Sequence, residues 1–375
     1  CYYNIPKKPL LDKFLYDDVP GAFLYTQRWN TLLIDEMQNY TNVDSEVCIS
    51  LSAIYATNRW GLSGTPIDNP KINIIMGVHY IVGDDTFPKC KQDAEKYVRT
   101  DYPGMKKIMV VRRNVDFAMP SCNETVITHS LNEDEENLYQ CMKNVIKNLI
   151  RNSFTDDRHL NAGLLSMITY LRQFVVCPRV CIPDENVLLG ELFSDQLTMF
   201  ELTSDMFTVS SRILEIQKVL NEHSNDRCIL FNVFRKNVDK CLEYLENDRP
   251  LFVITSKQSI QERADVISEF QQSDNGVLLL TYKIGSAGLN LQCSSVVLLA
   301  DVAWCDGNIQ QAIARVLRRG QTETVNVYMF TSNLSIEKSM FIKHIDKKYM
   351  IKSLMDGHLK GYVKKMTTYD IIKDI

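Results

Sequence analysis

The stretch Val277-Leu-Leu-Leu-Thr281-Tyr-Lys283-Ile-Gly285-Ser286-Ala-Gly288-Leu-Asn290-Leu-Gln292, followed by Val296-Val-Leu-Leu299, decides the fold class. Each apolar run has the length of a buried strand, and a turn rich in small residues separates the two. Small residues let backbone N–H groups approach a phosphate closely. We therefore expect an α/β protein whose strand-to-helix turns carry its chemistry.

Short apolar runs and amphipathic segments alternate in the same way along the rest of the chain. Strands are expected at Thr31–Ile34, Arg59–Leu62, Cys228–Phe231, Leu251–Ile254, Val277–Leu280, Val296–Leu299 and Val325–Phe330. Helices are expected at Lys236–Glu246, Ser259–Gln272 and Asn308–Leu317. Strands that alternate with helices in this way indicate a parallel sheet.

The middle of the chain lacks this alternation of strands and helices. Asn132–Arg151 and Leu160–Val176 are helical in pattern with no strand between them, and Val180–Ser211 contains acidic residues but no lysine or arginine. We therefore predict a first, incomplete α/β lobe at 1–130, a helical insertion at 131–180, an acidic linker at 181–210, and a second α/β lobe with a helical tail at 211–375.

Composition narrows the class of protein. The 375 residues are 45% hydrophobic and 23% charged, enough for two ordinary domains, and the net charge of −4 confines any nucleic-acid contact to local patches. The 11 cysteines include no Cys-x-x-Cys pair, so reduced thiols in an intracellular protein are expected rather than zinc ligands. No secretory signal is visible, and the apolar runs are too short to cross a bilayer.

Two carboxylates follow the first apolar strand, in Thr31-Leu-Leu-Ile-Asp35-Glu36. Phosphoryl transfer needs a metal near the phosphates and a group that positions water, and this pair offers both: Asp35 for Mg²⁺ and Glu36 for the water. A solvated strand end is the alternative for this pair alone. The next strand, Arg59–Leu62, runs into Ser63-Gly64-Thr65-Pro66, a turn of small residues that suits contact with a phosphate or a neighbouring loop.

The strongest signal is Asn308-Ile-Gln310-Gln311-Ala-Ile-Ala-Arg315-Val-Leu-Arg318-Arg319-Gly320-Gln321. Its spacing predicts Arg315 and Arg318 on one face near the end of a helix, where an arginine fork stabilises charge that develops on a γ-phosphate. A basic helix end that complements the helix dipole is the alternative.

Taken in order, these segments resemble motifs II, III, IV, V and VI of superfamily-two helicases, and in particular the Swi/Snf-type branch. The branch usually has Asp-Glu-Ala-His where this chain has Asp35-Glu36-Met37-Gln38, and Arg-x-His-Arg-x-Gly-Gln where Leu317 replaces the His. Asp301-Val-Ala-Trp304 resembles part of the Asp-Pro-Trp-Trp-Asn-Pro segment. The resemblance extends from about residue 28 to 350 and implies two RecA-like lobes.

The resemblance also implies the function and its residues. It implies an ATP-dependent translocase on double-stranded DNA that uses Mg²⁺, in the nucleus of a eukaryote or otherwise in the cytoplasm or at a viral replication site. The implied nucleotide contacts are Asp35, Gln38, Gly285, Gly288 and Gln311, with Glu36, Arg315 and Arg318 as catalytic groups. The implied DNA contacts are Ser63, Thr65, Lys283, Ser286, Asn290 and Trp304.

The chain contains no Gly-x-x-x-x-Gly-Lys-Ser/Thr string, the loop that grips nucleotide phosphates. We expect that the full polypeptide begins earlier and that these 375 residues alone hydrolyse ATP poorly or not at all. A decayed motor that serves as a DNA- or protein-binding scaffold is the non-enzymatic alternative, and a strand-separating or RNA-remodelling helicase is the enzymatic one.

Overall fold

The apolar runs form parallel strands in two compact units of the chain. We analysed a computed structural model that describes residues 23–67, 71–109, 120–152, 158–181, 210–245, 249–285, 288–303 and 306–356. Unit 1 comprises residues 1–112 and 345–365, and unit 2 comprises residues 113–344 and 366–375. Within the described ranges, no helix is both long and apolar enough to cross a membrane.

Unit 1 contains a two-stranded parallel sheet with helices against one face. Its elements are α2 (Phe23–Thr26), β1 (Trp29–Ile34), η1 (Met37–Tyr40), α3 (Glu46–Ala53), β2 (Ala56–Gly61), α4 (Ile72–Ile81), α5 (Lys91–Thr100) and η2 (Met105–Lys107). Ile34 at the end of β1 packs with Cys48 of α3 and Ile75 and Val78 of α4. This packing fixes the end of β1, where the two carboxylates follow.

Gly77 of α4 permits an unusually close approach between backbone segments of unit 1. A Cβ atom at this position would lie 1.6 Å from the carbonyl oxygen of Thr41, which follows η1. Arg59 of β2 also crosslinks this unit, because its guanidinium donates to the carbonyl oxygens of Leu51, Ile54 and Ile81 at 2.6, 2.5 and 2.6 Å. Gly77 therefore lets α4 pack against the residue after η1, and Arg59 ties β2 to α3 and α4.

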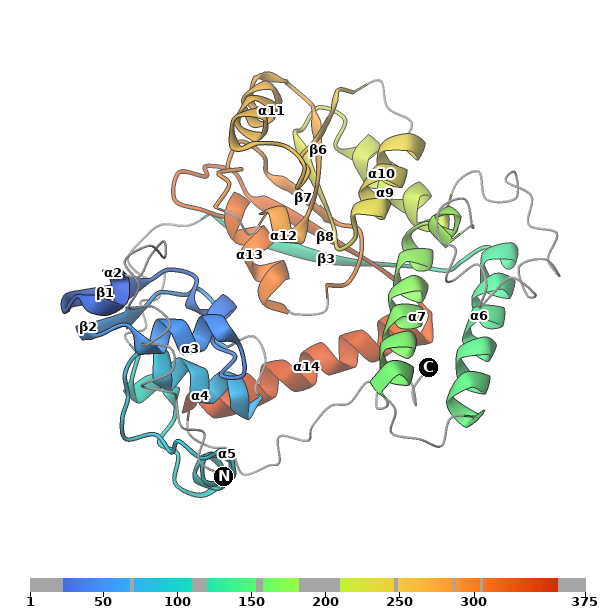
Figure 1. Ribbon diagram of the computed structural model, residues 1–375. Coiled ribbons are helices and arrows are strands. Elements are labelled where there is room, and N and C mark those ends of the chain that lie inside the picture. Colours follow the sequence, from blue (N-terminus) through green and yellow to red (C-terminus); the bar gives the residue numbers. More distant parts are fainter. Residues whose placement is uncertain are drawn as a thin grey trace. The chain divides into compact units, whose positions relative to one another are not determined.

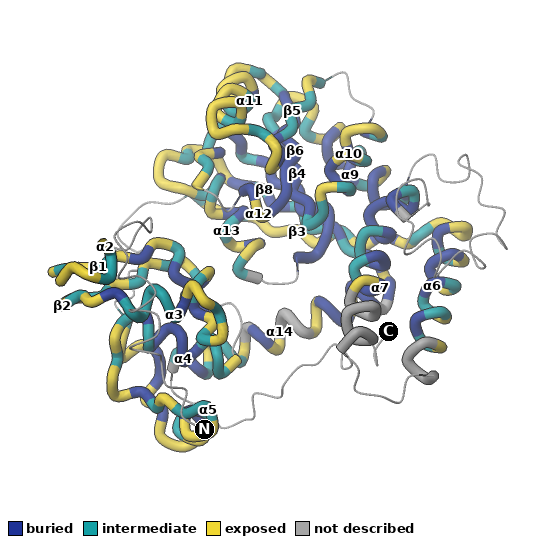
Figure 2. Tube along the Cα trace, viewed as in Figure 1, coloured by how far each residue is buried: buried dark blue, intermediate teal, exposed yellow. Residues whose placement is uncertain are grey.

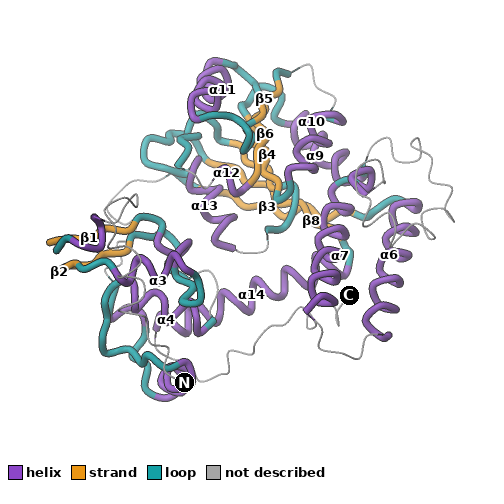
Figure 3. Tube along the Cα trace, viewed as in Figure 1, coloured by secondary structure: helices purple, strands orange, loops and turns teal. Residues whose placement is uncertain are grey.

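Unit 2 is built on a six-stranded parallel sheet in the order β3-β8-β7-β4-β6-β5. Its strands are β3 (Cys122–His129), β4 (Cys228–Asn232), β5 (Leu251–Val253), β6 (Val277–Thr281), β7 (Val296–Leu299) and β8 (Val325–Ser332). Its helices are α6 (Glu133–Asn152), α7 (Arg158–Val176), η4 (Pro178–Cys181), α9 (Ser211–Glu222), α10 (Arg235–Tyr244), α11 (Ile260–Gln272), α12 (Tyr282–Gly285) and α13 (Asp306–Val316). Figures 1 and 3 show helices on both faces of this sheet.

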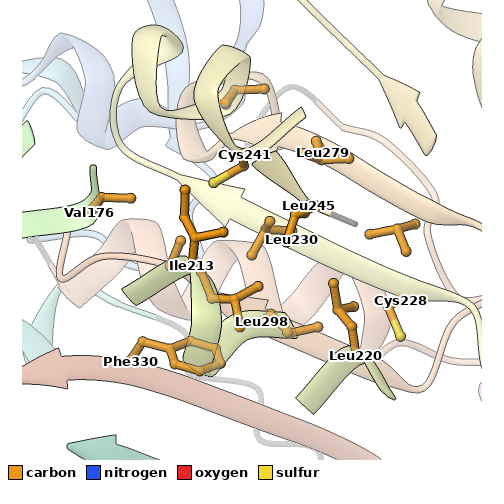
Figure 4. Packing of buried hydrophobic residues seen from close by; sticks show 14 of the residues in the cluster. Val176, Ile213, Leu220, Cys228, Leu230, Cys241, Leu245, Leu279, Leu298 and Phe330 are labelled. Atoms are coloured by element: carbon orange, nitrogen blue, oxygen red, sulfur yellow. The ribbon is translucent and has the colours of Figure 1, made fainter. Parts of the chain in front are cut away.

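Alternate side chains of each central strand enter separate apolar cores on the two faces. Leu230 of β4 and Leu298 of β7 pack with Ile213 of α9 and Cys241 of α10 (Figure 4). On the other face, Phe231, Leu280 and Leu299 pack with Phe270 of α11 and Ile313 of α13. The central strands are buried along their whole length, and Figure 2 shows them in dark blue. The seven expected strands are therefore present, and the predicted α/β fold with parallel sheets is confirmed.

The structure contains one strand, β3, that was not predicted. Because β3 belongs to unit 2, the division between the units lies before this strand and not at the expected residue 130. β3 pairs along its length with β8, from Cys122 opposite Val325 to His129 opposite Ser332. It is an edge strand with polar, exposed side chains, so it lacks the apolar run that identifies a central strand. Helices α6 and α7, expected as a separate insertion, belong to unit 2 as well.

The last described helix, α14 (Ser335–Asp356), contributes to the cores of both units. Ile336 and Met340 in its first half pack with Tyr139 of α6 and Leu171 of α7. Leu354 in its second half is fully buried in the core of unit 1. The expected helical tail is therefore part of the packed structure and begins at Ser335.

Candidate functional site

One group of predicted site residues lies in unit 1, at the carboxyl end of β1. Ile34 is 6% exposed and ends the strand, whereas Asp35 is exposed and Glu36 is half-exposed. Glu36 has φ 47° and ψ 46°, and it is the only non-glycine residue with positive φ in the described part of the chain. This left-handed conformation costs a non-glycine residue about 1–2 kcal/mol, so the surrounding contacts must hold it.

Backbone hydrogen bonds to the neighbouring strand hold this turn. The N–H of Leu62 donates to the carbonyl oxygen of Ile34 at 2.8 Å, and the N–H of Met37 donates to the carbonyl oxygen of Leu62 at 3.0 Å. The N–H of Glu36 donates to Oδ1 of Asp35 at 2.9 Å. The register of β1 and β2 therefore carries the predicted motif II and motif III segments to the same end of the sheet.

Gln38 joins the two segments through side chains. Its Nε2 donates to Oε2 of Glu36 at 2.6 Å, and its Oε1 accepts from the hydroxyl of Ser63 at 2.5 Å, 25 residues further along the chain. Ser63 Oγ in turn accepts the backbone N–H of Thr65 at 3.0 Å. Gln38 is buried, at 9% exposed. These bonds all lie within unit 1.

Carboxylate oxygens at this strand end suit Mg²⁺, which binds through one or two carboxylates together with phosphate oxygens and water. Asp35 is exposed at the end of β1 and meets this requirement. No group of three or more His, Cys, Asp or Glu side chains that could hold a metal ion occurs among the described residues. A single exposed carboxylate such as Asp35 fits Mg²⁺ that takes its other ligands from phosphate and water.

A second group of predicted site residues lies in unit 2, where β6 leads into α12. Lys283 is exposed on α12, and Asn290 is exposed after it. Gly288 has φ 82°, which favours glycine, although a Cβ there would have open space. Gly285 is glycine for a different reason, since a Cβ would lie 2.6 Å from the Phe231 ring. Ser286 and Trp304 lie outside the described residues.

Helix α13 and the turn after it carry the predicted motif VI. Gln311 and Arg315 lie on the helix and are half-buried. The helix ends at Val316, so Arg318 lies in the following turn, and the prediction that both arginines share a helical face was wrong. The contacts of Gln321 account for the end of α13 at Val316. Its Nε2 donates to the carbonyl oxygens of Gln292 and Ser294 at 3.2 and 2.8 Å, which holds the chain after α13 against the residues before β7.

The two segments of this second group are hydrogen-bonded to each other. The backbone N–H of Leu291 donates to the carbonyl oxygen of Arg315 at 3.1 Å, which connects the residues after Gly288 to the last turn of α13. Gly320 has φ 104°, and a Cβ there would lie 3.1 Å from Oε1 of Gln292. The motif V segment is therefore hydrogen-bonded directly to the backbone of Arg315.

Asp301, at the carboxyl end of β7, connects the surrounding strand ends. Both of its carboxylate oxygens accept the backbone N–H of Val233, at 2.9 and 3.1 Å, and its carbonyl oxygen accepts the hydroxyl of Tyr282 at 3.0 Å. Arg172 of α7 donates to the adjacent Val302 carbonyl oxygen at 3.1 Å. Burial raises the pKa of Asp301 to about 7, although Arg172, the Val233 N–H and Arg212 favour its charged form.

Arg212 of α9 is the largest fully buried side chain described in this unit. It donates to the carbonyl oxygens of Ala300 and Phe330 at 2.7 and 3.1 Å, to Oε2 of Glu337 at 2.7 Å, and to Nε2 of His129. Burial, followed by the nearby Arg212 charge, lowers the pKa of His129 to about 4. Sequence reasoning missed Arg212, although an arginine beside the apolar positions Ile213 and Ile216 is the signal that identifies it.

Two protein-family models match the chain. The SNF2-related domain matches residues 20–180, and the helicase conserved C-terminal domain matches residues 211–320, so together they cover well over half of the chain. The two domains define the chain as a helicase-like motor with two RecA-like lobes. It belongs to the SNF2 family of superfamily-two helicases and ATPases.

Its relatives in sequence are distant, but their similarity extends over most of the chain. It is 25% identical over 87% of its length to the DNA repair and recombination protein RAD54-like of Gallus gallus, and it covers 48% of that protein. It is 22% identical over 90% of its length to the putative helicase 172L of Invertebrate iridescent virus 6, and covers 63% of it. The chain thus spans about half the length of the RAD54-like relatives it matches.

Among solved structures, the chain is similar to the Sulfolobus solfataricus SWI2/SNF2 ATPase core in complex with dsDNA. The TM-score is 0.48 and the identity 21%, over 97% of this chain and 76% of that one. The C-terminal part of the Fun30 ATPase domain gives a TM-score of 0.47 at 17% identity, over 68% of this chain and 98% of that one.

Proposed function

We propose that these residues form the motor of an ATP-dependent translocase on double-stranded DNA. The observation that carries the proposal is the hydrogen-bonded chain from Glu36 through Gln38 to Ser63 and Thr65. It connects the carboxylate suited to position a water with the turn suited to contact a phosphate backbone. Membership of the SNF2 family supports the use of a nucleotide at this position.

Each residue of unit 1 then has a defined task. Asp35 would hold Mg²⁺ at the carboxyl end of β1, and the ion would neutralise charge on the phosphates of ATP. Glu36, fixed by its left-handed backbone and by Gln38, would orient the attacking water and accept its proton. Gln38 thus acts on Glu36 from within the same unit.

The other residues with proposed roles lie in unit 2. Arg315 and Arg318 would stabilise the negative charge that develops on the transferred phosphoryl group, and Gln311, Gly285 and Gly288 would border the nucleotide. Lys283, Ser286, Asn290 and Trp304, with Ser63 and Thr65 of unit 1, are the proposed contacts to DNA. Because these contacts would meet the backbone rather than base edges, binding would be insensitive to sequence and weakened by salt.

The test compares wild type with Glu36→Gln in the longest natural polypeptide that contains these residues. Duplex-stimulated ATP turnover should fall by at least about a hundredfold in Glu36→Gln, as for loss of a positioned base, while duplex binding remains. Glu46→Gln, an exposed glutamate of α3, is the matched control and should keep its turnover.

Two outcomes would contradict the proposal. Wild type without turnover, but with duplex binding, would favour a scaffold. Turnover stimulated by RNA or by single strands in preference to duplex DNA would favour an RNA-remodelling or strand-separating helicase.

A further inference from the structure

The corner of unit 1 that follows α4 contains a buried hydrogen-bonded network apart from the proposed site. Nδ1 of His79 lies 2.7 Å from Oδ2 of Asp84, and Nε2 lies 2.9 Å from the hydroxyl of Tyr102. The same hydroxyl contacts Sδ of Met105, the first residue of η2. Phe87 stacks on the His79 ring with centroids 3.9 Å apart, so the plane of the buried imidazole is fixed.

The Tyr102 hydroxyl has one hydrogen and two neighbouring acceptors. Burial raises the pKa of Tyr102, so the hydroxyl keeps this hydrogen. Burial opposes ionisation of Asp84, but the hydrogen bonds from Thr86 and His79 lower its pKa, so the carboxylate accepts from Nδ1. A neutral His79 therefore presents Nε2 as an acceptor, which attracts the Tyr102 hydrogen more strongly than a thioether sulfur does.

A proton on Nε2 reverses the bond between His79 and Tyr102. Burial lowers the pKa of His79, although the hydrogen bond and charge of Asp84 favour the imidazolium, so the proton binds below about pH 6.5. The imidazolium donates from both nitrogens, to Asp84 and to the Tyr102 oxygen. The Tyr102 hydrogen must then turn to Met105. Both ring nitrogens keep a partner in either state, so the network can take up the proton without a loss of hydrogen bonds at the ring.

Other elements bring three further ionisable groups to this corner, namely Tyr97 of α5, Arg59 of β2 and Cys48 of α3. The Tyr97 ring packs against the Tyr102 ring at 5.9 Å between centroids. Arg59 is bonded to backbone carbonyl oxygens, and burial raises the pKa of the Cys48 thiol to about 11, so this thiol is neutral near pH 7. Among the described residues, Asp84 is therefore the group whose charge acts on His79.

We propose that His79 is a proton-controlled switch that moves the hydrogen bond of Tyr102 between α4 and η2. When His79 is neutral, the Tyr102 hydroxyl donates to α4. When His79 is charged, the hydroxyl donates to Met105 and so anchors the first residue of η2. A buffer acid supplies the proton that forms the new N–H bond, and no other covalent bond of the protein changes.

Asp84→Asn sets the switch without acid. The N–H and hydroxyl of Thr86 both donate to Oδ1 of Asp84, at 3.0 and 2.6 Å, so an amide at this position keeps its oxygen towards Thr86. Its NH₂ group then donates to Nδ1 of His79, and the ring hydrogen moves to Nε2. This neutral tautomer donates to the Tyr102 oxygen as the imidazolium does, and it should direct the Tyr102 hydrogen to Met105.

Nuclear magnetic resonance of the 375-residue chain reads both ends of the network. At about pH 7.5, above the ordinary pKa of histidine, nitrogen-15 shifts should place the ring hydrogen on Nδ1 of His79 in wild type and on Nε2 in Asp84→Asn. The methyl carbon-13 resonance of Met105 should shift between the two. Asp85→Asn, which removes an exposed neighbouring carboxylate, is the matched control and should leave both signals unchanged.

An acid titration of wild type tests the same switch without a variant at Asp84. The Met105 methyl should shift in the direction seen in Asp84→Asn, with the midpoint of the His79 ring nitrogens and below about pH 6.5. In Tyr102→Phe, which removes only the hydroxyl, the Met105 shift should disappear from both experiments. The amide resonances of α4 and α5 report whether unit 1 keeps its fold.

Three results would overturn the inference. The ring hydrogen could stay on Nδ1 in Asp84→Asn, or the Met105 methyl could stay constant while His79 titrates. The third is a Met105 shift of equal size with Tyr and with Phe at position 102, which would show that the charge acts through space. The Asp84→Asn comparison decides the question even if acid unfolds unit 1 before His79 binds its proton.

Discussion

The side chain of Arg212 offers the sharpest test of how unit 2 is held together. Arg212 is fully buried and Glu337 is 4% exposed, and their side chains meet at 2.7 Å. Arg212→Met removes this ion pair and the donors to the carbonyl oxygens of Ala300 and Phe330. The Glu337 carboxylate still accepts hydrogen bonds from the N–H of Ser332 at 2.5 Å and from the Ser332 hydroxyl at 2.6 Å, but it loses its counter-charge.

The expected loss of unfolding free energy is about 4 kcal/mol, because breaking a buried pair from one side costs about 3–5 kcal/mol. The two orphaned carbonyl oxygens lie within the same network, so their cost overlaps with this figure rather than adding to it. A typical domain has about 5–15 kcal/mol of stability, so unit 2 of the variant should be close to unfolding.

Native-state hydrogen exchange read by mass spectrometry measures this effect separately for unit 2, in peptides that cover β7 and β8. The matched control is Arg235→Met. Arg235 pairs with Asp239 at 2.8 Å on the surface, where an ion pair contributes at most about 1 kcal/mol.

The double variant Arg212→Met with Glu337→Met should recover about 1–2 kcal/mol relative to Arg212→Met alone, because no buried charge then lacks a partner. A loss below about 1 kcal/mol in Arg212→Met, similar to the control, would refute the reasoning, since the arginine would then be a solvated side chain.

Three further predictions concern pH and packing. The folded-state pKa of His129 lies below its usual value, so the neutral imidazole contributes stability to unit 2 above about pH 6.5. This contribution should disappear as the pH falls towards 4, a loss of about 3 kcal/mol in the free energy of unfolding. In acid-unfolding curves, His129→Gln should abolish this loss. The pKa of Asp301 is raised instead, so this carboxyl lowers the stability of unit 2 as the pH rises from 4 to 7. Without it, unit 2 of Asp301→Asn should gain stability over this pH range more steeply than wild type. Hydrogen exchange at each pH measures the difference. Gly77→Ala places a Cβ against the Thr41 carbonyl and should cost unit 1 about 2–3 kcal/mol in urea unfolding, whereas Gly64→Ala, which meets no atom within 4 Å, should be nearly neutral.

The central strands were predictable because burial on both faces leaves an unbroken apolar run. Cys228–Asn232 and Val277–Thr281 are buried at every position, and hydrophobicity alone identifies them. β3 was missed because an edge strand needs only one partner and tolerates exposed polar side chains such as Asn123 and Glu124. Its membership of unit 2 depends on pairing with a distant strand, which the sequence pattern does not encode locally.

The site was predictable only to the level of its segments. An apolar strand followed by Asp35 and Glu36 indicated a strand end with two carboxylates, and the structure has them there. The role of Gln38 depends on the left-handed backbone at Glu36 and on the register of β1 with β2, neither of which a residue pattern determines. Arg318 was misplaced because helix periodicity cannot detect the bonds of Gln321 that end α13 early. That both groups of residues bind one nucleotide stays a prediction.

The pairing of β3 with β8 has a consequence for synthesis on the ribosome. Asn123 and Asn326, which share a hydrogen bond across these strands, are 203 residues apart. β3 therefore emerges long before its partner exists, and the sheet cannot be completed until nearly all of the described chain has left the exit tunnel. During that interval the nascent strand must avoid pairing with neighbouring chains on the same message, and its exposed Asn123, Glu124 and Thr125 side chains would hinder such pairing.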